Sequence, residues 1–322
     1  MGREYLVATG RRVAPGQYAA GRQLQTLLLR VGLYRDQWED AARNTGRAIQ
    51  REKLNQAAVA EVIAQHLYDD GHPETDTKLV RQLKDKVSRA LSGNGLTPET
   101  LDWFVQAFHI SAHDARRLYD IYDGHIELTE IVGNLEPPEP GSGIRPLDHR
   151  TTLLFEHHYI GCQQLPVHHH TQQTIYSLRD GLTSYQYRID TPEAEVRLKR
   201  GGTPGKVYAI GHGYYAIDIN FPRPLSFGET QYLDYWTNFR YTVAPPSEFR
   251  RGTHERVEHL DMRVEFHQDK LPRQLWWAEW ADYRDIHRDI VTRKDVTLDE
   301  ERSAHRYLDA IEHTVVGFYW EW

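Results

Sequence analysis

The spacing of apolar residues changes partway along this chain. Upstream, apolar residues recur every three to four positions, as on one face of a helix, and Arg51–Asp70 is an example. Downstream, they alternate with polar residues, as in a strand. Arg256–His267 is the clearest such segment, with Leu260, Met262 and Val264 on one face and polar side chains on the other. The pattern therefore predicts a helical first half and a β-rich second half.

The two halves meet at residues 133–148, GNLEPPEPGSGIRPLD, where proline and glycine exclude a regular element. We expect an interdomain linker there, between a helical domain at 1–132 and a β-rich domain at 149–322. Short alternating segments separated by turn residues predict an antiparallel β-sandwich or barrel for the second domain. One segment in it, Arg302–His313, is expected to be helical instead. The predicted fold class is α + β multidomain.

Helix starts can be read from capping residues in the first half. Thr97 followed by Pro98 combines an N-cap residue with a proline in the first helical position. Ser111 with Asp114 is close to a capping box, and Gly124 is expected to end that helix. Together with the apolar spacing, these signals predict an all-α bundle of four or five helices.

Charge is distributed unevenly between the halves. The chain carries a net charge of −7, yet residues 1–125 hold 17 basic against 16 acidic residues, so all the excess acid lies downstream. A protein that coats nucleic acid needs more positive charge than this. A near-neutral half with one concentrated basic helix is compatible with sequence-specific binding.

That basic helix is predicted at Lys78–Ser92, where apolar residues form one stripe. Its polar side carries a mostly basic set of candidate DNA-binding residues: Lys78, Arg81, Lys84, Asp85, Lys86, Ser88, Arg89 and Ser92. A helix docked by one face and basic on the other suits recognition of duplex DNA, because lysine and arginine contact phosphates and arginine or serine reaches base edges. The alternative is an ordinary amphipathic helix with a solvated polar face.

Local sequence carries a family resemblance at this helix. Residues 87–93, VSRALSG, followed by LTPET at 96–100, resemble the end of the recognition helix in lac-repressor-type regulators. The stretch continuing through residues 101–108 and 111–124 resembles the second half of an Xre-type, lambda-repressor-like domain. The resemblance implies a helix-turn-helix bundle in which Ser88, Arg89 and Ser92, with Lys84 and Asp85 a turn earlier, contact bases or the DNA backbone.

Histidines are the main candidates for chemistry in the second half. On a strand, His168 and His170 would share a face and offer two imidazoles to a metal. The pair resembles the His-x-His of a cupin site, but that pattern requires a glutamate where Gln172, Gln173 and Thr174 stand. Motifs for zinc peptidases, Walker A loops and serine nucleophiles do not occur. The sequence therefore predicts no enzyme, no cofactor and no metal, with His168 and His170 as weak metal candidates.

The leading hypothesis is a transcriptional regulator. Its helical half would bind duplex DNA as a homodimer, and its β-domain would sense a small-molecule or protein effector, or dimerise. Two alternatives are a non-enzymatic adaptor protein with a degenerate helix-turn-helix and a metal-dependent β-fold enzyme. Neither a signal peptide nor a membrane-spanning apolar run is present, so we expect a cytoplasmic protein without a membrane partner.

Overall fold

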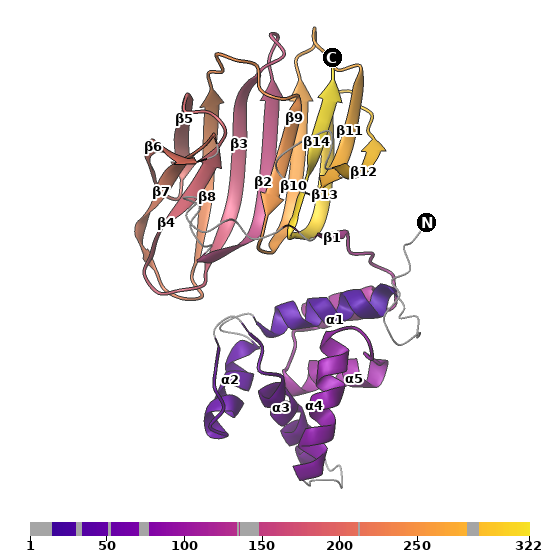
Figure 1. The fold of residues 1–322 in the computed structure, drawn as a ribbon. Coiled ribbons are helices and arrows are strands. Elements are labelled where there is room, and N and C mark those ends of the chain that lie inside the picture. The colour runs from indigo at the N-terminus through magenta and orange to yellow at the C-terminus, as the bar shows by residue number, and fades with distance from the viewer. Residues whose placement is uncertain are drawn as a thin grey trace. The chain divides into compact units, whose positions relative to one another are not determined.

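The chain folds into two compact units, Met1–Leu128 and Thr129–Trp322, in a computed structural model (Figure 1). The residues described are 15–29, 34–50, 53–70, 77–133, 135, 148–211, 213–281 and 290–322. Most of the expected linker at 133–148 lies outside them. Its described start belongs to the second unit, because Gly133 and Leu135 donate backbone hydrogen bonds to the carbonyls of Glu312 and His313 at 2.9 and 2.8 Å.

The first unit holds six helices among its described residues. They are α1 Pro15–Leu28, α2 Arg35–Asn44, α3 Gln56–Asp69, α4 Thr77–Leu91, α5 Pro98–Ala107 and α6 Ala112–Tyr122. These helices pack around one apolar core, in which Trp38, Phe104 and Phe108 are fully buried. The first turn of α5 is capped by Thr97, whose hydroxyl accepts from the backbone of Thr100 at 3.1 Å.

The end of α4 is fixed by a glycine in a left-handed conformation. Gly93 has φ +71° and donates its N–H to the carbonyl of Ala90 at 3.0 Å, while Asn94 donates to the carbonyl of Arg89. A Cβ on Gly93 would lie 2.3 Å from the Cα of Tyr18 in α1. This close approach requires glycine and holds the end of α4 against α1.

The second unit is made of strands. They are β1 Glu130–Val132, β2 His149–Ile160, β3 Pro166–Ser177, β4 Leu182–Ile189, β5 Ala194–Arg200, β6 Thr203–Gly211, β7 Tyr214–Leu225, β8 Thr230–Phe239, β9 Glu248–Thr253, β10 Val257–Phe266, β11 Gln274–Trp280, β12 Ile290–Asp295, β13 Ser303–Glu312 and β14 Thr314–Glu321. Seven form a large sheet, in the order β1-β13-β10-β2-β3-β8-β5. The others form a four-stranded sheet, β12-β11-β14-β9, and a three-stranded sheet, β4-β7-β6 (Figure 1).

Among the described residues, the two smaller sheets pack against the same face of the large sheet, which we call the inner face. One core packs its β2, β10 and β13 against the four-stranded sheet, where Val264 and Phe318 are both fully buried. A second core packs its β3 and β8 against the three-stranded sheet through residues such as Leu233 and Ile219. The opposite face of the large sheet, the outer face, carries polar and aromatic side chains.

The predicted fold class was wrong. The fold is predominantly β, with 44% of the described residues in strands, rather than an all-α helix-turn-helix bundle joined to an antiparallel sandwich or barrel. The large sheet is mixed, because β10 runs parallel to β2 and β1 runs parallel to β13. Alternation reveals which residues share a face of a strand, but it carries no information on the direction of the neighbouring strand.

The helical unit also departs from a helix-turn-helix. Residues 70–76 separate α3 from α4, where that motif has a turn of about three or four residues. The sequence shows the same long segment around Gly71–Glu74. The helices of this unit are short, and the unit makes up the smaller part of the chain.

The helix expected at Arg302–His313 is strand β13. Ala304, Leu308 and Ile311 are buried and do have helical spacing, which explains the wrong prediction. Their backbone instead pairs with β10 on one side and β1 on the other. Pairing on both sides satisfies the strand's hydrogen bonds and overrides the local pattern.

Candidate functional site

Two surfaces are candidates for function, and the first is the polar face of α4. Leu83, Val87 and Ala90 are buried beneath the helix. The predicted DNA-contacting residues that can be placed are all exposed: Arg81, Lys84, Asp85, Lys86, Ser88, Arg89 and Ser92. The side chain of Lys78 lies outside the described residues. Seven of the eight predicted residues are therefore exposed to solvent.

The basic groups of α4 whose side chains are described lack acidic partners among the described residues. Arg81 and Lys84 make no ion pair with any described carboxylate. Lys86 places its Nζ 4.7 Å from the ring centroid of Trp103 in α5, and Arg89 donates from Nε to the carbonyl of Asp85 at 3.4 Å. Neither contact neutralises a charge, so four cations stand against the single carboxylate of Asp85.

The second surface is the outer face of the large sheet, where strand register aligns side chains in three rows. Residues directly opposite one another on β13, β10, β2, β3 and β8 form each row. The first row is Tyr307, Asp261, Phe155, Gln172 and Asp234; the second is His305, Arg263, His157, His170 and Trp236; the third is Ser303, Glu265, Tyr159, His168 and Asn238. Neighbours in a row are close enough to interact.

A cavity of about 410 Å³ opens over these rows. It is lined by Phe155, Glu156, His157, His170, Gln172, Asp261, Arg263, Asp299, Ser303 and His305. Phe155 is the apolar member of this lining, and its side chain is 38% exposed. The cavity thus combines one exposed aromatic ring with many hydrogen-bonding groups.

The charged groups of the lining are held by partners. His305 Nε2 lies 3.2 Å from Asp261 Oδ1, and Arg263 Nη2 donates to Glu301 Oε2 at 2.6 Å. Asp299 accepts two hydrogen bonds from Ser303, one from its backbone N–H and one from its hydroxyl, at 2.8 and 2.6 Å. Arg263 is thus paired with a carboxylate, whereas Asp299 is held by an uncharged serine.

Two of the histidines are fixed in position. His157 Nε2 lies 3.2 Å from Glu265 Oε2, and its Nδ1 lies 2.6 Å from the Tyr159 hydroxyl. Burial, helped by the charge of Arg263, lowers the pKa of His157 to about 3, so the ring is neutral near pH 7. The hydrogen bond of this ring is the one between Nδ1 and Tyr159, whereas Nε2 is buried and has no hydrogen-bond partner among the described residues.

His170 is locked between an acid and an aromatic ring. Its Nε2 lies 2.8 Å from Asp234 Oδ1, and its ring stacks on Trp236 at 4.2 Å with planes 3° apart. Burial would raise the pKa of Asp234, but the contacts with His170, Gln172 and Lys199 together outweigh it and the pKa is lowered. The orientation of His170 is therefore set within the protein.

The weak metal candidates, His168 and His170, lie on the outer face together. His168 rests against Tyr159 at 4.2 Å and Trp236 at 5.2 Å between ring centroids. His170 already uses Nε2 for Asp234. Among the described residues, no group of three or more histidine, cysteine, aspartate or glutamate side chains could hold a metal ion. The geometry accounts for both rings through aromatic and acidic contacts.

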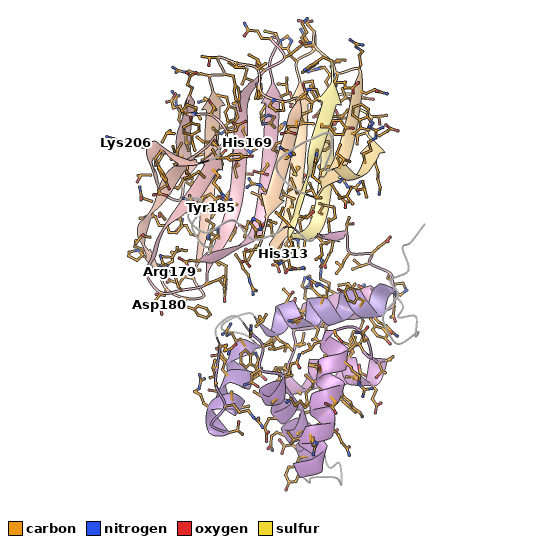
Figure 2. All side chains as sticks on the ribbon, in the orientation of Figure 1. His169, Arg179, Asp180, Tyr185, Lys206 and His313 are labelled. Atoms are coloured by element: carbon orange, nitrogen blue, oxygen red, sulfur yellow. The ribbon has the colours of Figure 1, made fainter. Side chains whose placement is uncertain are left out.

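A polar cluster centred on Glu156, which also lines the cavity, is buried on the inner face. Glu156 accepts from Arg251 Nε at 2.9 Å and also contacts Arg251 Nη2, and His169 Nε2 lies 3.3 Å away. Figure 2 labels His169 on β3. Burial would raise the pKa of Glu156, but Arg251 and His169 outweigh it and lower that pKa to about 2. The cluster ties the large sheet to β9.

Sequence comparisons identify no relatives. No family model matches the sequence, and no characterised protein is detectably similar to it. None of the described helices is both long and apolar enough to cross a bilayer.

Solved structures give only distant likenesses. One is a protease-like protein from Parabacteroides distasonis, with 8% identity over 54% of this chain and 40% of that one, and a TM-score of 0.36. Another is a mutant M1 zinc metallopeptidase from Deinococcus radiodurans, with 12% identity over 55% and 45% of the two chains and a TM-score of 0.32. This chain spans less than half of either protein, and neither their fold nor their chemistry is carried over to it.

Several residues of the cavity escaped prediction. Alternation in Arg256–His267 placed Asp261 and Arg263 on one face, and His168 and His170 were expected to share another. Phe155, Asp299 and Ser303 carried no motif. Phe155 and Ser303 meet the others through pairing between distant strands, and Asp299 joins them through its hydrogen bonds with Ser303. A register between strands β2 and β10 is the missing information, and no local signal encodes it.

Proposed function

We propose that this chain is a DNA-binding regulator that contacts duplex DNA through the exposed face of α4. The observation that carries the proposal is the set of four cations there without an acidic partner among the described residues. Such groups are free to replace the counterions condensed on DNA phosphates, which is the main source of affinity for nucleic acid. In this proposal the protein acts in the cytoplasm as a homodimer on two half-sites.

The rest of the face suits contact with bases. Ser88 and Ser92 are exposed beside Arg89, and both hydroxyl and guanidinium groups hydrogen-bond to base edges or phosphates. Asp85 is the exception, since it repels phosphates unless it accepts a hydrogen bond from a cytosine amino group. In this proposal the β-unit senses an effector or dimerises, and the chain itself is not an enzyme.

The test is binding of fluorescent duplex DNA to the purified full chain, measured by anisotropy at several salt concentrations. A variant combining Arg81→Ala, Lys84→Ala and Arg89→Ala should weaken binding at least about tenfold and reduce the salt dependence by roughly three phosphate contacts. Genomic fragments selected by the protein would then reveal whether it prefers a sequence.

A matched control is Arg116→Ala on α6. Arg116 is 85% exposed, and its contact with Asp120 is long, at 3.9 Å. It is therefore a solvated cation on a helix other than α4. Its removal should leave DNA affinity unchanged. No retention of DNA by the unaltered protein at low salt, or an equal loss in the Arg116 variant, would overturn the proposal and favour the adaptor protein, whose helices contact another protein.

A further inference from the structure

We propose that the cavity on the outer face of the large sheet binds a neutral saccharide. This inference gives a chemical class to the effector in the proposed function and rests on that function only for its regulatory meaning. The binding itself follows from the lining of the cavity, its charge balance and its size.

The charge distribution disfavours an anionic ligand. Asp261 faces His305, Asp299 is held by Ser303, and Arg263 is held by Glu301. A carboxylate or phosphate ligand would have to compete with Glu301 for Arg263, and it would also face the carboxylates of Asp261 and Asp299. Replacing such a charge-assisted partner is costly, because one charge is left without compensation in the partly buried site.

The same groups keep hydrogen-bonding capacity for hydroxyls. Each carboxylate oxygen has more than one lone pair, and Gln172 offers both a donor and an acceptor. Arg263 Nε is buried and has no acceptor among the described residues. A ligand hydroxyl that accepts from this N–H and donates to a neighbouring carboxylate would satisfy groups that the protein leaves incomplete.

Phe155 supplies the apolar part of the match. One face of a pyranose ring is lined with C–H groups, which pack on the electron-rich face of an aromatic ring. Phe155 is 38% exposed and stands directly between Asp261 on β10 and Gln172 on β3. A sugar ring stacked on Phe155 would therefore place hydroxyls next to hydrogen-bonding side chains on both sides.

The size is suitable for a short saccharide. A volume of about 410 Å³ lies within the range of about 300–1,000 Å³ that is usual for small-molecule sites. The flanking groups are also held in place, since His157 and His170 each have partners on neighbouring side chains. A site organised before binding loses less entropy when the ligand enters.

The experiment is a glycan array followed by isothermal titration calorimetry on the full chain. The soluble probes are glucose, galactose, N-acetylglucosamine, maltose and cellobiose, with glucuronate and glucosamine as charged counterparts. We expect at least one neutral saccharide to bind more tightly than its charged counterpart. Phe155→Ala and Asp261→Asn should each weaken that binding about tenfold, which corresponds to roughly 1.4 kcal/mol.

Tyr232→Ala is the matched control, because Tyr232 is also 38% exposed, lies on β8 of the same sheet, and does not line the cavity. It should bind the saccharide as the unaltered protein does, and thermal unfolding checks that the variants are folded. Binding of charged sugars alone, no binding to any neutral glycan, or unchanged binding in Phe155→Ala would overturn the inference.

The outcomes for DNA and saccharide can be separated. The variant lacking Arg81, Lys84 and Arg89 should keep full saccharide binding, since these residues belong to the other unit. If the unaltered protein binds DNA but no neutral saccharide, the saccharide site alone is refuted. Saccharide binding without DNA retention would refute the proposed DNA contact and leave the cavity assignment standing.

Discussion

The exposed face of α4 and the outer face of the large sheet are both rich in charged residues, but they differ in whether those residues have partners. On α4, Arg81, Lys84, Lys86 and Arg89 have no acidic partner among the described residues. On the large sheet, Asp261, Arg263 and Asp234 are each held by a neighbouring side chain. The first surface offers net charge, whereas the second offers oriented hydrogen-bonding groups.

This difference indicates different kinds of ligand. Unpaired surface cations attract a polyanion over the distance of a Debye length, and the attraction weakens as salt is added. Paired groups have little long-range field, and they select a ligand by the geometry of donors and acceptors. The contrast teaches that counting charged residues says less about a partner than establishing how many of them are already neutralised.

The largest expected effect concerns the most deeply paired charge, Glu156. Glu156→Ala leaves Arg251 without its partner in a site where the carboxylate is 1% exposed. We expect the free energy of unfolding to fall by about 3–5 kcal/mol, measured by urea denaturation followed through tryptophan fluorescence. Replacing both residues, with Glu156→Leu and Arg251→Met, should recover much of the loss. A cost below about 1 kcal/mol for Glu156→Ala would mean that the pair is effectively solvated.

Salt should weaken DNA binding by α4 much more than saccharide binding by the cavity. If the four cations of α4 each contact a phosphate, DNA affinity should fall roughly a hundredfold between 50 and 200 mM salt. Saccharide affinity should change by less than about twofold over the same range, because a neutral ligand carries no charge for salt to screen. Titrations of both ligands in the same buffers provide the measurement. Equal salt dependence for the two ligands would contradict the idea that only DNA binds through unpaired charge.

Acid should weaken the β-unit through His149. Burial, with a smaller contribution from Arg188, lowers the pKa of His149 to about 4 from 6.5. Below pH 6.5 the unfolded chain binds a proton that the folded chain does not, so stability falls as pH falls and the loss ends near pH 4. This site should cost roughly 2 kcal/mol between pH 6.5 and 5.

The comparison of His149→Gln with the unaltered protein isolates that contribution. Chemical denaturation at pH 6.5 and pH 5 should show a smaller pH-dependent loss in the variant. His157 and His158, whose pKa values are also lowered by burial, remain in both proteins and cancel in the difference. An identical loss in the two proteins would show that His149 is accessible to protons in the folded state.

The sequence predicts individual elements better than their arrangement. Thr97 caps α5, and the polar face of Arg256–His267 is the outer face of β10. These features depend on neighbours in the chain. The parallel pairing of β10 with β2 and the strand at β13 depend on partners far away in sequence, and so the fold class and the helix at Arg302–His313 were predicted wrongly.

The same limit applies to the two surfaces. The α4 set is local, because one helix carries every member, and its exposed face could be read from apolar spacing. The cavity gathers Phe155, Gln172 and Asp261 from three strands, and it appears only once their register is known. Nothing in the chemistry of Phe155 distinguishes it from a core residue before the sheet is assembled.

The smallest effect on stability is expected for the exposed ion pair between Glu301 and Arg263 beside the cavity. Glu301 is 74% exposed and pairs with Arg263, which also lies 3.7 Å from Glu265. Glu301→Ala should change the free energy of unfolding by less than about 1 kcal/mol, because exposed ion pairs contribute little. It should nevertheless release part of the charge of Arg263 into the cavity. Glucuronate should then bind a few-fold more tightly, while binding of the neutral saccharide stays the same. A glucuronate affinity that does not respond would show that Glu301 is not what neutralises Arg263.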